Sequence, residues 1–409
     1  MGYPGGVSDP KPAAKTTAPP LQPVAVVALA LDRSADRRRL VEVRDQLHAR
    51  DPAYAPGLWR DRMYRLDPTR NPALGHLVTQ ALVATRGGHD VGRLVAYQDL
   101  NHDLERGPGV GWFAAFDAAD AGAARALFEA AAAWLRARGC RRAFGPWPLT
   151  RDAEPGLQAG PDAAHTMTGA ADQGPGYGAL LAASGLTVAR RRHALRWRLA
   201  RLGLDPESAR VLAQAAEVAA TTELRVRPVD TRRLADEVPA LAQAHADSQR
   251  DAWGRAPAPE AAFAADLHEL MRHALPELCL VAEWRGQPVG MALTLPDLNR
   301  ILPRSGRLSP LARMRLPAAS RGQGHGRLHD LWVTPDLAGR GIESLLVAET
   351  GQVARRLGLL EVETLGLDDD AGAARQALQR GGAEPDHAIE IWRMDLSRLA
   401  ISKAISTEP

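Results

Sequence analysis

The sequence predicts an α/β protein built from two copies of one folding unit, and three observations support this prediction. Between residues 22 and 397, strand-like apolar runs alternate with helix-like amphipathic stretches, which is the pattern of α/β domains. Landmarks of the first half return in the same order about 200 residues later. The length of 409 residues is sufficient for two or three domains.

The repeated landmarks are a hairpin turn, a glycine after a helix, and a strand that closes with tryptophan. Glycine favours the tight turn of a hairpin and the left-handed position that ends many helices. Paired by copy, the landmarks are Arg86-Gly87 with Arg285-Gly286, Gly139 with Gly358, Gly185 with Gly382, and Trp197 with Trp392. Because the pairs keep one order, we expect two copies of the same unit rather than chance similarity.

These landmarks also predict where the chain divides. The first residues are rich in Gly, Pro, Ala, Ser and Thr and have little to bury, so we expect a disordered arm there. The second copy begins after a stretch with helical periodicity. The predicted parts are a disordered arm at 1–21, a first unit at 22–200, a linker helix at 201–222, a second unit at 223–397 and a tail at 398–409.

Composition and charge exclude several classes of function. Hydrophobic residues make up 45% of the chain and charged residues 24%, as in ordinary globular proteins. The 51 basic residues include only three Lys, but 48 acidic residues are interleaved with them and the net charge is +3. We therefore expect no nucleic-acid partner, although the excess of Arg keeps nucleic-acid binding open as a third alternative.

The apolar and cysteine patterns suggest a cytoplasmic protein without a membrane partner or a metal. The apolar run at 23–31 is far shorter than the roughly 20 residues that cross a bilayer, and we interpret it as the first strand. Cys140 and Cys279 form neither a disulfide framework nor a metal-ligand spacing.

The segment after the strand expected at 328–333 carries the strongest chemical signal. Pro335 ends the strand, a loop with Gly339 and Gly341 follows, and a helix is expected from Ile342. Glycine lets the backbone approach a ligand closely. The first N–H groups of a helix are unpaired and lie at the positive end of its dipole, so a pyrophosphate can dock there. Arg340 can add a bidentate charge.

The wider pattern Val-x-Pro-x-x-x-Gly-x-Gly-Ile-x-x-x-Leu, at 333–346, resembles the GNAT superfamily of N-acyltransferases in the segment that binds acetyl-CoA. The first half resembles an uncharacterised bacterial family of tandem GNAT proteins, in Asp51-Pro52, Asp67-Pro68, Asn71-Pro72 and Gly145-Pro146. The resemblance implies an α/β fold of two tandem GNAT-like units, each a mixed, mostly antiparallel sheet flanked by helices. It also implies acetyl-CoA or another acyl-CoA as co-substrate, with no metal.

The resemblance also assigns the residues that would hold the co-substrate. They are Leu331, Trp332, Val333, Gly339, Arg340, Gly341, Ile342 and Asp370. The chain departs from the superfamily in four places: Ala338 replaces a usual Arg or Gln, Glu343 a small residue, Asp370 an Asn, and Ala377 a Tyr that commonly protonates the thiolate. In the first copy, the corresponding loop at 117–122 has two acids and one glycine, so we expect no CoA there.

Two groups are predicted to take part in the chemistry. His329 lies on the strand before the loop, on the face of Leu331 and Val333 by the period of two, and is the expected base. His325 and Asp330 are reserves, and a structural histidine held by hydrogen bonds in the sheet is the alternative for His329. Backbone N–H groups near Val333 are expected to polarise the thioester carbonyl.

The sequence therefore predicts an acyl-CoA-dependent N-acyltransferase that acts on a small-molecule amine. The second copy is expected to be catalytic, and the degenerate first copy is expected to shape the acceptor cleft between the copies. His387 or water would protonate the thiolate. A non-catalytic acyl-CoA-binding or protein-interaction scaffold remains an alternative, favoured by Ala338 and Ala377.

Overall fold

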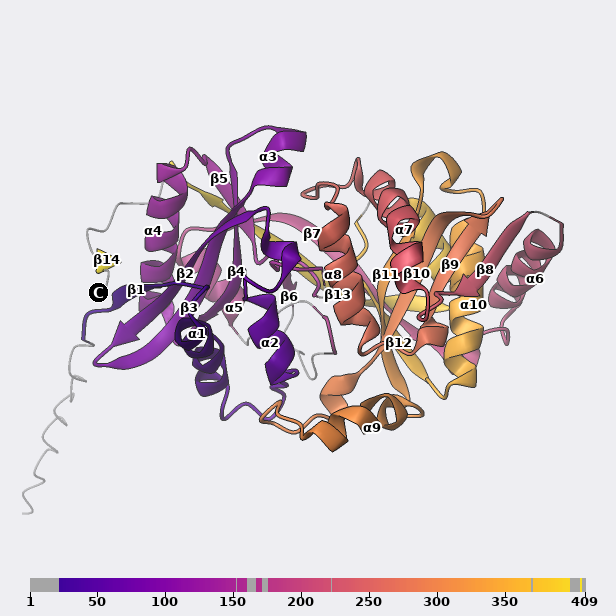
Figure 1. The fold of residues 1–409 in the computed structure, drawn as a ribbon, viewed down its shortest axis with the longest axis horizontal. Helices are drawn as coiled ribbons and strands as arrows, with labels where there is room; N and C mark the ends of the chain where they lie inside the picture. Colours follow the sequence, from indigo (N-terminus) through magenta and orange to yellow (C-terminus); the bar gives the residue numbers. More distant parts are fainter. Residues whose placement is uncertain are drawn as a thin grey trace, which may run out of the picture.

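The structure is a computed structural model that describes residues 22–151, 153–159, 167–170, 176–221, 223–368, 371–397 and 405–406. Two α/β copies lie side by side, the N-terminal copy in indigo to magenta and the C-terminal copy in red through orange to yellow (Figure 1). The arm at 1–21 and the tail, apart from 405–406, lie outside the described residues. No helix in the described part of the chain is both long enough and apolar enough to cross a bilayer.

The N-terminal copy follows the predicted alternation of strands and helices. Its strands are β1 Ala25–Leu29, β2 Leu77–Arg86, β3 His89–Asp99, β4 Val110–Ala118, β5 Arg142–Gly145, β6 Leu157–Ala159 and β7 Thr187–Arg198. Its helices are α1 Ser34–Leu47, α2 Trp59–Arg65, α3 Leu100–Arg106, α4 Ala121–Ala137 and α5 Tyr177–Ala183, with short 3₁₀ turns at Pro72–Leu74 and Leu199–Arg201.

The linking helix and the C-terminal copy repeat this order. The helices are α6 Pro206–Thr221, α7 Leu234–Gln249, α8 Glu260–Met271, α9 Pro310–Ser320, α10 Ile342–Arg356 and α11 Gly372–Arg380, with 3₁₀ turns at Pro276–Leu278, Leu298–Arg300 and Pro335–Leu337. The strands are β8 Leu224–Pro228, β9 Cys279–Trp284, β10 Gln287–Pro296, β11 His325–Val333, β12 Glu361–Thr364 and β13 Ala383–Asp395, and β14 Ile405–Ser406 pairs with β1.

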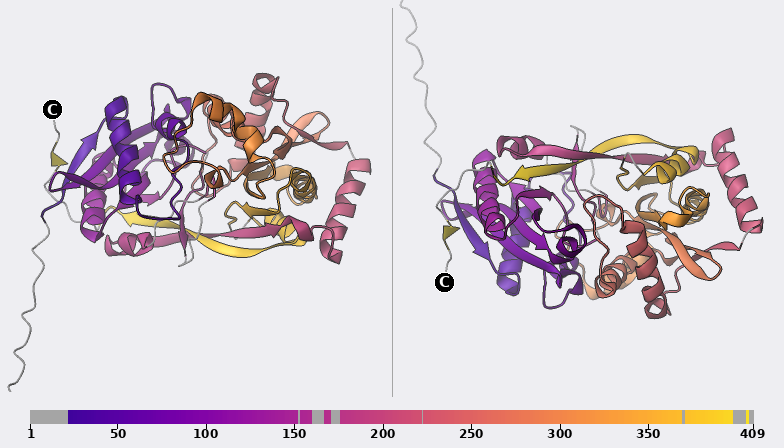
Figure 2. Two further views of the ribbon diagram at one scale, coloured as in Figure 1. Left: turned by 90° about the horizontal axis from the view of Figure 1, so that it is seen from below. Right: turned by 90° about the horizontal axis from the view of Figure 1, so that it is seen from above.

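All these strands form one sheet, and the last long strand of each copy joins the other copy. The order is β14-β1-β2-β3-β4-β5-β13-β7-β12-β11-β10-β9-β8, with β6 pairing beside β13. Thus β7, from the N-terminal half, pairs with β12 of the C-terminal copy, and β13 pairs with β5 of the N-terminal copy. Figure 2 shows these two long strands running together from one copy to the other. The exchange fixes the two copies against each other.

Each copy is a three-layer sandwich with helices on both faces of the sheet. In the N-terminal copy, α4 covers one face with apolar side chains such as Leu127 and Phe128, and α1 covers the other with Leu40. In the C-terminal copy, α10 packs on one face through Leu346, and α7 and α8 pack on the other through residues such as Phe263. Burial of these side chains supplies the main stabilising force of each copy.

Candidate functional site

The sheet of the C-terminal copy opens between β11 and β12. These parallel strands pair from His325 opposite Glu361 to Leu328 opposite Thr364. Beyond that point, the chain after β12 stays beside β7 through an isolated bridge between Leu367 and His193. In the described part of the chain, residues 330–333 of β11 pair with β10 alone. One edge of β11 is therefore left open just before the glycine loop.

Backbone N–H groups face this opening. Thr334 donates its N–H to the Val289 carbonyl at 2.8 Å, which directs its N–H toward β10. Successive N–H groups along a strand point alternately to the two sides, so that of Val333 points away from β10 and into the opening. By the same alternation, the Leu331 N–H also points away from β10 and into the opening. The polarising role of the N–H groups near Val333 remains a prediction, and the strand geometry leaves the Val333 N–H free of β10.

A β-bulge displaces His329 from its expected face. Leu293 lies opposite Asp330 and Thr294 lies opposite Leu328, so His329 is the extra residue on β11. Leu328, not His329, packs in the same core cluster as Leu331. The predicted sharing of a face by His329, Leu331 and Val333 is therefore wrong, because the bulge adds one residue and reverses the alternation.

His329 instead meets a segment of the N-terminal copy. Its Nε2 atom forms a 2.8 Å hydrogen bond with the Arg151 carbonyl oxygen. Because a carbonyl only accepts, Nε2 carries the hydrogen and only Nδ1 can accept a proton. Asp330 next to it pairs with the Arg151 guanidinium at 2.6 Å. The base role of His329 remains a prediction, with its acceptor atom now specified.

The glycine loop forms an open cradle at the N-terminus of α10. Gly339 and Gly341 have φ angles of 74° and 93°, a left-handed conformation that favours glycine. A Cβ atom built at either residue meets no atom of the described chain within 4 Å. Arg340 between them is exposed, and Ile342 is buried at the first helical position. The residues present therefore fit a pyrophosphate group.

Glu343 occupies part of this cradle. It is 6% exposed, and its carboxylate accepts the Gly339 N–H at 3.0 Å. The carboxylate pre-shapes the loop but competes for a donor that a phosphate would use.

Of the other predicted co-substrate residues, Leu331 and Trp332 are buried in the cores on opposite faces of β11. Asp370 lies outside the described residues.

A cavity of about 130 Å³ lies between the copies and reaches the opening of the sheet. His329, Asp330 and Leu365 line it from the C-terminal copy, together with side chains of α7 and α8. The segment after β5 lines it from the N-terminal copy, with Arg151 at the point nearest His329. The cavity thus joins the predicted catalytic strand to residues of the other copy.

Buried ion pairs hold the segment after β5 in place. Glu154 of the N-terminal copy accepts hydrogen bonds from Arg327 at 2.6 Å and from Arg192. Glu154 also accepts the Gly366 N–H at 3.2 Å, just past β12. Burial alone would raise the pKa of Glu154, but the two guanidiniums outweigh it and lower the pKa to about 2. The carboxylate is therefore ionised at neutral pH and ties both halves of the chain together.

Four of the residues around this cavity carry no signal in the sequence. They are Arg151, Glu154, His245 and Arg255. Each follows or lies within an ordinary helix or loop, and no spacing marks it. Only the packing of one copy against the other brings them to His329.

The N-terminal copy lacks the cradle at the equivalent helix. Asp120 caps α4 by accepting the Ala123 N–H at 3.0 Å. The same carboxylate binds both terminal nitrogens of Arg86, at 2.5 and 3.0 Å. The hydrogen bond with Arg86 has the largest effect on this carboxylate, and the pKa of Asp120 is lowered to about 2. A fixed negative charge thus stands where an anion would have to dock.

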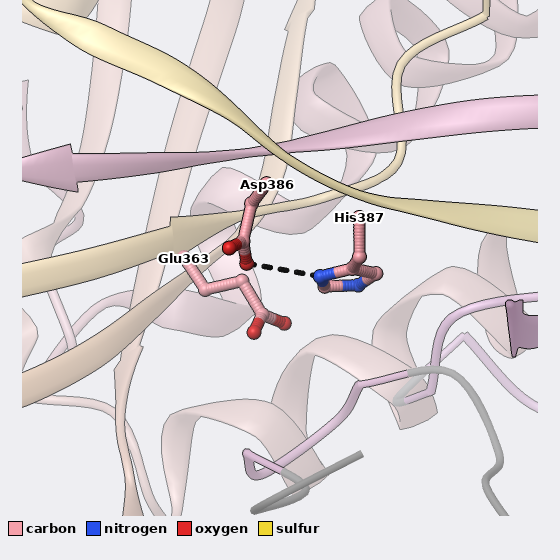
Figure 3. A group of neighbouring side chains, drawn as sticks. All are labelled: Glu363, Asp386 and His387. Carbon is pink, nitrogen blue, oxygen red and sulfur yellow. Dashed lines mark hydrogen bonds and ion pairs between the residues drawn. The ribbon is translucent and has the colours of Figure 1, made fainter. Parts of the chain in front are cut away.

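One group of side chains could offer three ligand atoms to a metal ion. Glu363, Asp386 and His387 have such atoms within 4.8 Å of one another, on β12 and β13 (Figure 3). However, Asp386 binds Arg196 through both oxygens, and Glu363 binds Arg327 at 3.3 Å. His387 Nδ1 lies 2.9 Å from Asp386. The group is satisfied as an ion-pair network, and we assign it to no metal.

Comparison with known proteins agrees with this architecture. The Acetyltransferase (GNAT) family matches residues 238–381, which span α7 to α11 and include the glycine loop. A protein named bacterial ceramide synthase from Caulobacter vibrioides (strain NA1000 / CB15N) is 30% identical over 296 residues, covering 69% of this chain and 73% of its own length. Protein YghO from Escherichia coli (strain K12) is 27% identical over 290 residues, covering 69% and 71%.

Solved structures share the two-copy arrangement. A tandem GNAT protein from the clavulanic acid biosynthesis pathway superposes with a TM-score of 0.52 at 15% identity, covering 91% of this chain and 98% of that one. At 15% identity the match shows the fold alone, but it covers both copies. Taken with the family match and the relative in Caulobacter, it shows that the chain belongs to the GNAT superfamily of acyltransferases as a tandem member.

Proposed function

We propose that this protein transfers an acyl group from acetyl-CoA or another acyl-CoA to the amine of a small molecule, and that the C-terminal copy performs the reaction. One observation carries the proposal. The open cradle of Gly339 and Gly341 continues along the free edge of β11 to His329, which borders the cavity between the copies. A phosphate site, a polarising backbone and an acceptor cavity therefore follow one another along a single strand.

The chemistry needs few protein groups. The neutral amine attacks the thioester carbonyl, a C–N bond forms, and the C–S bond breaks to release the CoA thiolate. The Val333 N–H polarises the carbonyl oxygen from the open edge. His329 Nδ1, directly or through a water molecule, accepts the proton that the nitrogen loses. A thiolate is a good leaving group and can take its proton from water, which makes a tyrosine at Ala377 dispensable.

The N-terminal copy has a different part in this proposal. Asp120 and Arg86 block its own helix terminus, so it holds no CoA. Arg151 and Glu154 from the segment after its β5 instead build the wall of the acceptor cavity. One copy thus supplies the reaction strand and the other supplies the acceptor cleft.

A long-chain amine is a specific candidate for the acceptor. The Caulobacter relative is named a ceramide synthase, and a ceramide is the N-acyl product of a long-chain base. A second cavity, of about 260 Å³, shares a wall with the first at residues 147–150 and includes Leu58, Ala114, Leu149 and Met167. Charged residues such as Arg62 and Arg93 also line this cavity, and its apolar part suits a hydrocarbon chain.

Two measurements test the proposal. Acetyl-CoA should raise the melting temperature, because a ligand that binds the native state stabilises it. Release of the CoA thiol should then rise above background with some member of an amine panel that pairs short amines with long-chain ones. Binding without thiol release from any amine would favour the scaffold alternative, and no thermal shift would refute the co-substrate site.

His329→Ala tests the proposed base. Its kcat should fall about 100-fold or more, with little change in acetyl-CoA affinity. The exposed His268 on α8 provides the control, since His268→Ala should leave both quantities unchanged. Normal turnover of His329→Ala would remove His329 from the mechanism.

A further inference from the structure

The cavity between the copies contains an arginine whose guanidinium forms no direct ion pair with a described residue. Arg255 lies in the loop between α7 and α8 and lines this cavity. Its guanidinium forms no hydrogen bond or ion pair with any described residue; only its backbone atoms do. Burial, followed by the guanidiniums of Arg192 and Arg151, lowers the pKa of Arg255 to about 10. The side chain therefore remains charged at neutral pH in a place that disfavours charge.

The carboxylates of Glu154 and Asp330 offset part of this charge and act to raise the pKa of Arg255, but both are already bound by other guanidiniums. Three other guanidiniums near the cavity form ion pairs with carboxylates. The pairs are Arg151 with Asp330, Arg192 with Glu154, and Arg327 with Glu154 and Glu363. Among the described residues, no carboxylate forms an ion pair with the Arg255 guanidinium itself. A partly buried guanidinium without a direct ion pair is a suitable group to bind an anionic ligand.

A buried histidine adds a second polar group to the same wall. His245 on α7 is 2% exposed and lines the cavity. Its Nε2 atom is buried without a hydrogen-bond partner in the described part of the chain. Burial and the charges of Arg151 and Arg255 hold the pKa of His245 well below its usual range, so the ring is neutral. Unsatisfied buried groups of this kind are rare and need an explanation.

The N-terminal copy holds Arg255 in position. Arg106 on α3 donates to the Arg255 carbonyl oxygen at 3.4 Å, and Asn101 donates to that of Pro257. Gly254, with a φ of 68°, lies against the Trp147 ring, where a Cβ atom would approach the ring to 2.9 Å. The loop is therefore built against the other copy, and the position of Arg255 does not depend on its own side-chain contacts.

We propose that Arg255, with His245 beside it, binds an oxyanion of the acceptor, so that the substrate is an amine that also carries a carboxylate or phosphate group. This inference rests on the proposed function and names the class of its acceptor. The oxyanion accepts hydrogen bonds from the Arg255 guanidinium and from the His245 ring. The same cavity contains His329, so an acceptor anchored by its anion lies next to the predicted base.

Paired acceptors test the assignment. Each pair differs only in the anionic group: a short amino acid against its amide, and a long-chain amino alcohol phosphate against the free alcohol. With saturating acetyl-CoA, we expect kcat/KM of the wild-type protein to favour the anionic member about tenfold or more. Arg255→Gln should abolish this preference, and His245→Asn should weaken it. Comparing the short with the long pair distinguishes a soluble acceptor from an anionic amphiphile.

Arg250→Gln is the matched control, because Arg250 is an exposed arginine nearby that pairs with Asp247. It should keep the preference for anionic amines. Equal kcat/KM for both members in the wild-type protein, or a preference that survives Arg255→Gln, overturns the inference while leaving acyl transfer intact. Melting temperature and acetyl-CoA affinity of Arg255→Gln verify that the variant folds.

A binding measurement separates this inference from the proposed function. Inorganic phosphate should raise the melting temperature of the wild type and of Arg250→Gln, compared with sodium chloride of equal ionic strength. Arg255→Gln should lose the phosphate-specific part of the shift. If no amine releases thiol, the phosphate result still decides the anion site, and an equal shift in all three proteins refutes it.

Discussion

The two copies meet the same structural problem, the N-terminus of a helix that follows a central strand, and solve it in opposite ways. Helix α4 is capped by Asp120, whose carboxylate is fixed by Arg86. Helix α10 begins after Gly341 in a left-handed conformation, with open space around it. Capping stabilises the first helix, whereas the second leaves its N–H groups for an anion.

Under the proposed function, this difference divides the work between the two copies. The N-terminal copy has closed its own anion site, yet Arg151 and Glu154, from the loop after its β5, reach into the site of the other copy. The C-terminal copy retains the open cradle and the open strand edge. The following variants test this comparison.

Gly341→Asp should have the largest effect. It places a carboxylate in the cradle and forces a non-glycine residue to a φ of 93°. We expect acetyl-CoA affinity to fall about 1000-fold or more, measured by titration calorimetry. Gly286→Asp, at another open glycine with a φ of 76°, controls for backbone strain alone. Unchanged affinity in Gly341→Asp would mean that the loop does not bind CoA.

Glu154→Gln should break the link between the copies. Because the pKa of Glu154 is lowered from 4.5 to about 2, its ionised form stabilises the fold above pH 4.5, and this contribution disappears as the pH falls toward 2. We expect a loss of about 3 kcal/mol at pH 7, and a flatter acid dependence between pH 4.5 and 2.

Urea unfolding at several pH values measures both effects of Glu154→Gln. The exposed Glu105 on α3 supplies the control, since Glu105→Gln should leave stability and its acid dependence nearly unchanged. An acid dependence of Glu154→Gln identical to that of the wild type would show that the Glu154 ion pairs contribute little.

Asp120→Ala examines the closed site of the N-terminal copy. Losing the cap of α4 should cost about 1 kcal/mol of unfolding free energy. Acetyl-CoA stoichiometry should stay at one per chain, because the loop before α4 has no glycine cradle. Asp120→Asn, which keeps a capping oxygen, should recover much of the stability. If Asp120→Ala bound a second acetyl-CoA, the Asp120 carboxylate alone would exclude CoA from this copy. The missing glycine cradle would then not be needed to explain the exclusion.

Glu343→Gln should have the smallest effect. The amide oxygen can still accept the Gly339 N–H, but the negative charge beside the phosphate site is gone. We expect acetyl-CoA to bind about two- to fivefold more tightly, as measured by calorimetry. Glu349→Gln, farther along the same helix, should leave the affinity unchanged. Weaker binding in Glu343→Gln would instead show that the charged carboxylate is needed to shape the loop.

The sequence by itself determined the local features of this protein. The turns at Gly87 and Gly286, the helix that starts at Ile342, and the glycine loop before it all appear where the pattern predicted them. The duplication was also visible, because both copies bury the same faces and need the same turns. Such signals are local: they depend on the period of apolar residues and on a few backbone conformations that only glycine adopts easily.

Only the tertiary structure decided which strand pairs with which, and therefore what surrounds the site. A strand pattern does not identify its partner, so nothing in 187–198 or 383–395 indicates that β7 and β13 change places. The bulge at His329 depends on the fit between β10 and β11 rather than on the pattern of either strand. Likewise, Arg151, His245 and Arg255 converge because two copies pack together, and contacts between residues this distant in sequence leave no local periodic signal.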